Sequence, residues 1–242
     1  MNHGFERNAG MDAQALVLIA EDEPEIVDIL KAYLAREGIR SAWAADGRAA
    51  LEMHLALKPD LVLLDVRMPY VDGWQVLSEV RARGQTPVIM VTAHDQDIDK
   101  LMALRIGADD YVVKPFGVRE LVARAKGLLR RPVPASEPSR PRRVGDVVLD
   151  VGALELRRGA QVLTLSAREA ALLAHLMQHA DRVVPRDELL VEVWGYRDRG
   201  VRTRTVDVHV QKLRTKIRDF VGSDDWIATA RGAGYRFVGA LT

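Results

Sequence analysis

The sequence of 242 residues contains no cysteine. Disulfide bonds and thiolate metal sites are therefore excluded, and a reducing compartment suits such a chain. Aromatic residues make up only 5% of the sequence, and no apolar run approaches the roughly 18 residues that a membrane helix needs. The N-terminus also lacks the apolar stretch of a signal peptide. We therefore expect a cytoplasmic protein without a membrane segment.

Net charge is also small, at +1, but it is unevenly distributed. Residues 1–131 contain 17 basic and 20 acidic residues, a net charge of −3, whereas residues 132–242 contain 18 and 14, a net charge of +4. An acidic half joined to a basic half favours a polyanionic partner for the second half. With 48% apolar and 29% charged residues, the composition is that of a globular protein.

A proline-rich stretch separates the two halves. Residues 130–143 read RRPVPASEPSRPRR, with four prolines; proline at this density interrupts both helices and sheets. We predict a flexible tail over 1–14, a first domain over 15–131, a linker over 132–143 and a second domain over 144–242. The alternative is a long surface loop within one domain, although structureless loops of this length are uncommon there.

The first half alternates short apolar strands with amphipathic helices. The predicted strands cover 15–20, 39–43, 61–65, 88–92 and 110–113. The predicted helices cover 24–36, 46–57, 72–83, 95–105 and 117–130. Continuous apolar runs such as Val88-Ile89-Met90-Val91 are typical of strands that are covered on both faces. The pattern predicts an α/β domain with a five-stranded parallel, doubly wound sheet.

Polar side chains follow the predicted strands at their carboxyl ends, where open α/β sheets bind ligands. They are Glu21 and Asp22 after the first strand, Asp65 and Thr92 at the ends of the third and fourth, and Lys114 after the fifth. Clustered carboxylates without histidine or cysteine suit Mg²⁺. A carboxylate can also act as a nucleophile toward phosphorus. Each residue alone fits an ordinary cap or turn, so only their joint placement predicts a phosphoryl-acceptor site centred on Asp65.

These residues, with Asp65-Val66-Arg67-Met68-Pro69 and Lys114-Pro115-Phe116, are in the order and spacing of a response-regulator receiver domain, which residues 15–131 resemble. The resemblance implies that a sensor histidine kinase phosphorylates Asp65 and that Lys114-Pro115 is a cis peptide. It implies Thr92 and Tyr111 as switch residues and Lys114 as a phosphoryl contact. The implied Mg²⁺ ligands are Glu21 through water, Asp22, Asp65 and the backbone carbonyl of Arg67.

Two further features follow from the resemblance. Arg67 and His94 each lie two residues beyond a site residue, and we predict that they tune autodephosphorylation. A homodimer formed on phosphorylation would use the charged face around the fourth helix, fifth strand and fifth helix. Its residues are Lys100, Asp109, Asp110, Glu120, Arg124 and Arg131, paired as Lys100–Glu120, Asp109–Arg124 and Asp110–Arg131. The alternative is a solvated face with ordinary pairs within one chain.

The second half begins with strand-like sequence over 147–165 and then carries helix signals. Ser166 and Glu169 form a capping box before an apolar run, and Pro185 opens a further helix. Over 203–219, Val206, Val210, Leu213 and Ile217 share one helical face and basic residues occupy the other. Residues 226–238 read as two short strands joined by a glycine turn with Arg231 at its tip.

Residues 144–240 resemble the winged-helix DNA-binding domain of the OmpR/PhoB family, notably over 204–214 and 231–236. The resemblance implies that the 203–219 helix enters the major groove of promoter DNA, that the hairpin enters the minor groove, and that the loop over 194–201 faces RNA polymerase. Gln211 stands where some relatives carry a basic residue. The implied DNA contacts are Arg204, His209, Gln211, Lys212, Arg214, Thr229 and Arg231.

Two alternatives remain for the function. A Mg²⁺-dependent aspartyl-phosphate hydrolase also uses an aspartate nucleophile. That class requires a second carboxylate two residues after the nucleophile, where this chain has Arg67. A phosphate-accepting module without DNA binding is disfavoured by the basic helix and hairpin. Residues 94–116 resemble multidrug-efflux regulators of the AdeR and BaeR type, which would make an efflux operon the target. We therefore expect a transcription factor rather than an enzyme, with phosphoryl-acceptor and autophosphatase chemistry only.

Overall fold

The computed structural model describes residues 14–93, 106–130, 142–196, 205–222 and 226–241. The predicted helix over 95–105 and nearly all of the predicted tail and linker lie outside these residues. Within the described part of the chain, no helix is both long enough and apolar enough to cross a membrane.

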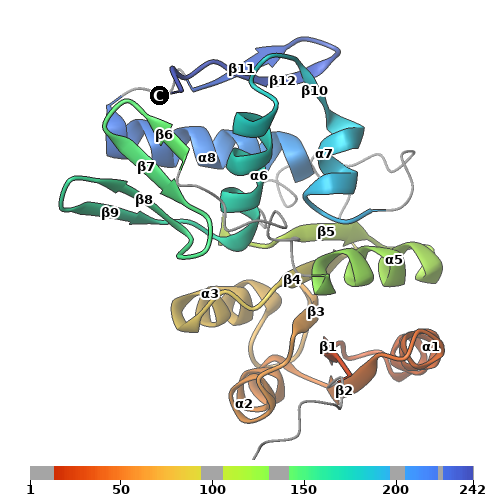
Figure 1. The fold of residues 1–242 in the computed structure, drawn as a ribbon. Helices are drawn as coiled ribbons and strands as arrows, with labels where there is room; N and C mark the ends of the chain where they lie inside the picture. Colours follow the sequence, from red (N-terminus) through yellow and green to blue (C-terminus); the bar gives the residue numbers. More distant parts are fainter. Residues whose placement is uncertain (1–13, 94–105, 131–141, 197–204, 223–225, 242) are drawn as a thin grey trace, which may run out of the picture.

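The first half forms a parallel sheet in the order β2-β1-β3-β4-β5. Its strands are β1 (Leu16–Ala20), β2 (Arg40–Ala44), β3 (Leu61–Asp65), β4 (Val88–Thr92) and β5 (Asp110–Val113). Its helices are α1 (Pro24–Arg36), α2 (Gly47–Leu57), α3 (Gly73–Arg83) and α5 (Val118–Leu129). Helices α1 and α5 cover one face of the sheet, and α2 and α3 cover the other (Figure 1). The predicted doubly wound parallel sheet is confirmed.

Local sequence explains where these elements begin. All five residues of β3 and of β4 are buried, as the continuous apolar runs predict for strands between two helical layers. The carboxylates of Asp46 and Asp72 accept hydrogen bonds from the backbone N–H groups of Ala49 and Gln75. These N-caps satisfy free donors at the first turns of α2 and α3.

The described residues of the second half form two antiparallel sheets and three helices. A four-stranded sheet joins β6 (Arg142–Val144), β7 (Val147–Asp150), β8 (Glu155–Arg158) and β9 (Gln161–Thr164) in that order. It is followed by α6 (Ala167–Gln178), α7 (Arg186–Glu192) and α8 (Thr205–Val221). A second sheet, in the order β10-β12-β11, consists of β10 (Val184–Pro185), β11 (Ile227–Ala230) and β12 (Gly234–Phe237). This is the predicted winged-helix arrangement.

Two sequence signals account for the helical core of this half. The capping box at the start of α6 is complete: Ser166 Oγ accepts from Glu169 N, and the Glu169 carboxylate accepts from Ser166 N. On α8, the four apolar residues of the predicted face are buried, namely Val206, Val210, Leu213 and Ile217. Strand β6 includes the last two residues of the segment that we predict as a linker.

Candidate functional site

The carboxyl ends of β1 and β3 bring together three acidic side chains. Glu21 and Asp22 follow β1 directly, and Asp65 ends β3, which pairs with β1 in parallel. Each residue offers a carboxylate oxygen, and these oxygens lie within 4.8 Å of one another. Glu21 and Asp65 are only 3% and 6% exposed, whereas Asp22 is exposed. The structure therefore brings the predicted acidic cluster together with one side open to solvent.

Lys114, directly after β5, reaches into this cluster. Its Nζ lies 2.9 Å from a Glu21 carboxylate oxygen and 3.1 Å from Asp65 Oδ2, with Glu23 Oε1 also at 3.1 Å. Burial alone would lower the pKa of Lys114, but its hydrogen bonds to Glu21 and Asp65 outweigh burial and raise the pKa. The lysine therefore stays charged beside Asp65, where it can stabilise negative charge.

Burial has the opposite effect on Glu21. It raises the pKa of this carboxyl to about 7, because the hydrogen bond from Lys114 only partly offsets desolvation and the charge of Asp65 adds to it. Three clustered carboxylates with a single lysine make a set that a divalent cation would stabilise. Oxygen-only ligands fit Mg²⁺. The three carboxylates present here are compatible with that ion.

The remaining predicted site residues surround the cluster. Arg67 lines, with Asp22, a hollow of about 430 Å³ beside the end of β3. Thr92 is buried at the end of β4, and its carbonyl accepts a hydrogen bond from Lys114 N at 2.7 Å. Tyr111 is buried on β5. The Lys114-Pro115 peptide bond is cis, as the receiver resemblance implies. His94 lies outside the described residues.

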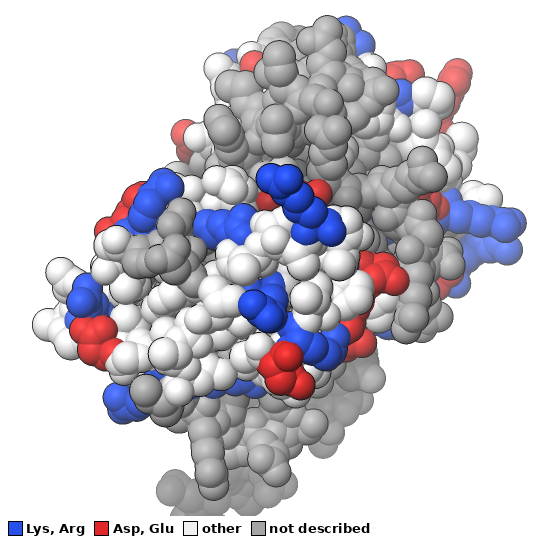
Figure 2. All heavy atoms as spheres, turned by 90° about the horizontal axis from the view of Figure 1, so that it is seen from above, with Lys and Arg blue, Asp and Glu red and all other residues white. Residues whose placement is uncertain are grey.

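A second candidate surface lies on α8 and the β11–β12 hairpin. Gln211, Thr229 and Arg231 are exposed, with Arg231 in the turn between the two strands. Arg214 is tied to the hairpin, because its Nε and Nη2 atoms donate to the carbonyl oxygen of Ile227 and Nη2 also donates to Thr229 Oγ1. Figure 2 shows Lys and Arg side chains spread over this end of the molecule, with acidic groups mainly toward its edges. Arg204 lies outside the described residues.

Two of the predicted DNA contacts instead face the first half of the chain. His209 is 5% exposed, its ring packs edge-on against Trp194, and Nδ1 lies 2.9 Å from the Thr205 carbonyl oxygen. Burial lowers the pKa of both His209 and Lys212. These two residues line a cavity of about 170 Å³ together with Arg81, Gly107 and Asp109. A phosphate contact from His209 therefore requires the two halves to separate.

Asp110, at the start of β5, is the centre of the contact between the halves. It is fully buried and accepts hydrogen bonds from Arg124 Nη1 at 2.9 Å, Thr205 Oγ1 at 2.6 Å and the Tyr196 hydroxyl. Arg124 belongs to the same half as Asp110, whereas Thr205 and Tyr196 belong to the other. A buried carboxylate is stable only when it is paired and hydrogen-bonded, so separation would leave Asp110 with fewer partners.

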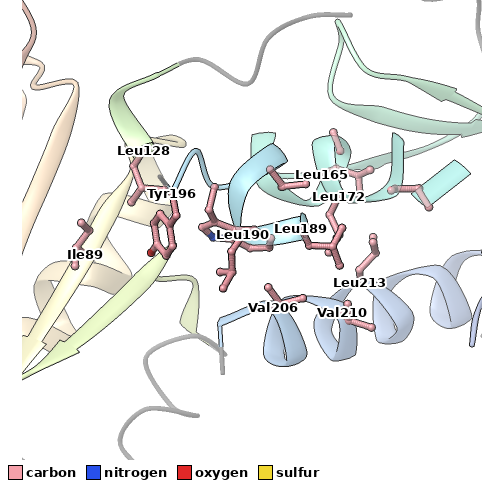
Figure 3. Packing of buried hydrophobic residues seen from close by; sticks show 14 of the residues in the cluster. Ile89, Leu128, Leu165, Leu172, Leu189, Leu190, Tyr196, Val206, Val210 and Leu213 are labelled. Carbon is pink, nitrogen blue, oxygen red and sulfur yellow. The ribbon is translucent and has the colours of Figure 1, made fainter. Parts of the chain in front are cut away.

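Apolar packing and close backbone contact extend this interface. Figure 3 shows Tyr196 between Leu128 of α5 and Leu190 of α7, and all three belong to one buried cluster that continues to α8. A Cβ atom built at Gly127 would lie 2.4 Å from the Trp194 carbonyl oxygen. Arg168 of α6 is buried, and its guanidinium donates to the carbonyl oxygens of Val193 and Leu128. The two halves are therefore docked over packed side chains and backbone.

Most charges predicted for a dimer face are paired within the chain. Arg81 Nη2 lies 2.7 Å from Asp109 Oδ2, and Arg124 pairs with Asp110 and with Glu120. Lys100 and Arg131 lie outside the described residues. The intermolecular pairing stays a prediction, and in this arrangement Asp110 and Arg124 are already occupied.

Comparison with known families agrees with the two halves. Residues 17–126 match the response regulator receiver domain, and residues 160–237 match the C-terminal domain of transcriptional regulatory proteins. The chain belongs to the response regulators. It is a two-component transcription regulator that binds DNA, and the family implies a histidine kinase as its partner.

Solved structures of response regulators are similar to this chain. Two mutants of the response regulator RitR are 28% and 29% identical, with TM-scores of 0.68 and 0.69, and each match covers 93% of this chain and 100% of that chain. The receiver domain of the Francisella response regulator 1452 is 35% identical with a TM-score of 0.48, covering 49% of this chain and 98% of that chain. The AdeR and BaeR type is not confirmed by these comparisons.

The residues that dock the two halves of this response regulator carry little sequence signal. The sequence predicts Trp194 and Tyr196 as part of a loop facing RNA polymerase, and it does not distinguish Arg168. All three are buried. Large aromatic residues next to a glycine in a loop are a weak signal of a buried contact, and nothing in the local pattern of α6 distinguishes Arg168 from a solvated arginine.

Proposed function

We propose that this response regulator accepts a phosphoryl group on Asp65 from the phosphohistidine of a sensor kinase. The observation that carries the proposal is the position of Asp65, which lies within 4.8 Å of two other carboxylates and 3.1 Å from the Lys114 ammonium. An aspartate oxygen forms a bond to phosphorus as the bond between phosphorus and the kinase histidine breaks, which gives an acyl phosphate and free imidazole.

The surrounding residues have distinct roles in this step. Lys114 places a permanent positive charge beside the phosphoryl oxygens, and Thr92 supplies a hydroxyl at the end of the neighbouring strand. Glu21, Asp22, Asp65 and the Arg67 carbonyl would hold Mg²⁺. The ion supplies charge neutralisation for the transferring group.

Docking of the two halves supplies the switch in this proposal. The docked form buries His209, turns Lys212 toward the receiver and engages Asp110 and Arg124. DNA binding through α8 and receiver dimerisation through the same charged face both compete with this arrangement. Phosphorylation, acting through Thr92 and Tyr111, favours the separated form. Tyr111 shares a buried apolar cluster with Val208 of α8, so a change at Tyr111 can reach the interface directly.

In the separated form, two copies would dimerise and bind promoter DNA. Gln211, Lys212 and the exposed Arg231 would contact DNA. The loop over 194–201, of which residues 197–201 lie outside the described residues, would face RNA polymerase. We extend the proposal to multidrug-efflux genes on the resemblance of residues 94–116 alone. Transcript profiling of a deletion strain tests that extension, and unchanged efflux transcripts would remove it.

The first experiment measures phosphoryl incorporation from acetyl phosphate with Mg²⁺ by intact-mass spectrometry, on wild type and Asp65→Asn. The proposal expects one phosphoryl group on wild type and none on the variant. It also expects a larger radius of gyration by small-angle X-ray scattering for the phosphorylated wild type. Steady release of phosphate that depends on Asp65, without stable incorporation, would instead support an aspartyl-phosphate hydrolase.

A further inference from the structure

Two histidines and one glutamate converge in the winged-helix domain, where α6 ends and α7 begins. His175 lies in the last turn of α6, and His179 is the C-cap residue of that helix. Glu188 lies in the first turn of α7. Each side chain offers one ligand atom, and the three atoms lie within 4.8 Å of one another. No step of the proposed phosphoryl transfer or DNA binding uses these residues.

Their spacing places the two imidazoles on one side of the helix end. Residues four apart on a helix are neighbours, and the ring centroids of His175 and His179 are 4.6 Å apart. His175 Nε2 lies 3.0 Å from Glu188 Oε1. In a tetrahedral zinc site with bonds of about 2.0–2.1 Å, ligand atoms are separated by roughly 3.3 Å. Small side-chain rotations would therefore bring all three atoms to bonding distance.

The surroundings suit a bound ion rather than a solvated surface cluster. The side chains of His175 and Glu188 are 15% and 28% exposed, so they are held by packing yet remain reachable from solvent. Water could complete a tetrahedral shell from the open side. Imidazole nitrogens with one carboxylate are ligands for zinc and its neighbours, whereas Mg²⁺ prefers oxygen alone. The chemistry differs from that of the acidic edge of the receiver.

We propose that His175, His179 and Glu188 form a site for a transition-metal dication, with zinc as the best fit, that joins the end of α6 to α7. The joined helices carry parts of the interface with the receiver: Arg168 lies at the other end of α6, and Trp194 follows α7. Metal occupancy would therefore fix the orientation of the α6–α7 pair on which domain docking depends.

Arg182 provides a test in which the proposal predicts the direction of the change in metal affinity. Its Nη2 donates to Glu188 Oε1 at 2.7 Å, and its Nη1 donates to Glu188 Oε2 at 2.9 Å. A cation bound at Oε1 would have to displace one of these hydrogen bonds and would meet the charge of the guanidinium. Arg182 therefore competes with metal, and removing it should strengthen binding. A role for Glu188 that is limited to the ion pair with Arg182 predicts no such gain.

The experiment titrates the metal-free full chain with Zn²⁺ by isothermal calorimetry, in excess Mg²⁺ so that the receiver carboxylates are masked. Four proteins are compared: wild type, His179→Gln, the double variant His175→Gln/His179→Gln, and Arg182→Ala. Asp65→Asn is the control for zinc binding at the receiver. Circular dichroism verifies that each variant is folded. Co²⁺ replaces Zn²⁺ in a parallel titration, because its visible spectrum reports tetrahedral coordination.

The proposal expects one equivalent of Zn²⁺ on wild type and on Asp65→Asn. Binding should weaken by at least about tenfold in His179→Gln, because loss of a group that only supports a metal ligand already costs about 10–100-fold. It should be absent in the double variant and tighter in Arg182→Ala. Equal binding by wild type and the double variant overturns the proposal, as does an absence of binding to wild type and Arg182→Ala.

Discussion

The hydroxyl of Thr205, the first residue of α8, donates a 2.6 Å hydrogen bond to Asp110 on the last strand of the receiver sheet. Ninety-five residues separate the two in sequence. Asp110 is also a residue that we predict for a receiver dimer. The helix proposed to read DNA and the face proposed to dimerise therefore share one buried carboxylate, which couples the two activities.

Replacing Thr205 with valine tests this coupling, because valine keeps the shape of threonine and removes its hydroxyl. A hydrogen bond to a charged group contributes about 1.5–3 kcal/mol. We therefore expect Thr205→Val to lower the equilibrium constant for docking of the two halves by between about tenfold and a hundredfold. The docked fraction can be measured by ¹⁹F NMR of fluorotryptophan at Trp194, which is fully buried at the interface.

Thr215→Val is the matched control for that variant. Thr215 lies on the same helix, and its hydroxyl donates to the Gln211 carbonyl rather than to the receiver. It should leave the Trp194 signal unchanged. An equal shift of the Trp194 signal in both variants would show that the effect comes from helix stability. Asp110 would then not couple the two halves.

Gly127→Ala should open the domain interface without touching the acidic cluster around Asp65. The added Cβ would lie 2.4 Å from the Trp194 carbonyl oxygen, a distance that the backbone must relieve by moving apart. Alanine is also a better helix former than glycine, so α5 itself should not lose stability. We expect a larger radius of gyration and tighter DNA binding by the unphosphorylated protein.

Gly117→Ala controls for the substitution itself. Gly117 caps the same helix, and a Cβ there has only an ordinary 3.8 Å contact with Glu120. This variant should keep the wild-type radius of gyration. If Gly127→Ala also keeps it, the close approach to Trp194 does not hold the halves together.

The elements were predictable from the sequence wherever local signals agree. The apolar runs of β3 and β4, with Asp46, Asp72 and Ser166 as N-caps, placed strands and helices within a residue or two of their observed bounds. Strand β6 was not predicted, because its three residues continue a proline-rich stretch and gain strand geometry only by pairing with β7.

The candidate site followed from topology, whereas the interface did not. Parallel strands bring their carboxyl ends to one edge of the sheet, so the topology predicts that Asp65 and Lys114 lie at the same edge. The contact of Asp110 with Tyr196 depends on how two domains dock. Periodicity within one element carries no information about such a contact. It also does not show that Trp194 covers His209, which is buried.

We expect Arg231 to contact DNA and Arg214 to stabilise the domain. Arg231 is exposed in the hairpin turn, so Arg231→Ala should leave the melting temperature unchanged and reduce the salt dependence of DNA binding by about one counterion. Arg214 holds the Ile227 carbonyl and Thr229, so Arg214→Ala should lower the melting temperature of the domain. Salt titrations by fluorescence anisotropy and thermal melts measure both. A lower melting temperature for Arg231→Ala would assign that residue a structural role too.

Acidification should weaken docking through His209. Burial lowers the pKa of this imidazole below 6.5, and separation returns it toward that ordinary value. The separated form then binds more protons as the pH falls below 6.5, so docking is strongest above that pH and weakens by at most about tenfold per pH unit below it. The charged groups facing the ring are Asp109, Lys212 and Glu169. His209→Gln, which does not titrate, should flatten the pH dependence of the Trp194 ¹⁹F signal between pH 5.5 and 7.5, a range of about one unit on either side of 6.5. If His209→Gln shows the same pH dependence as the wild type, a group other than His209 takes up the proton that weakens docking.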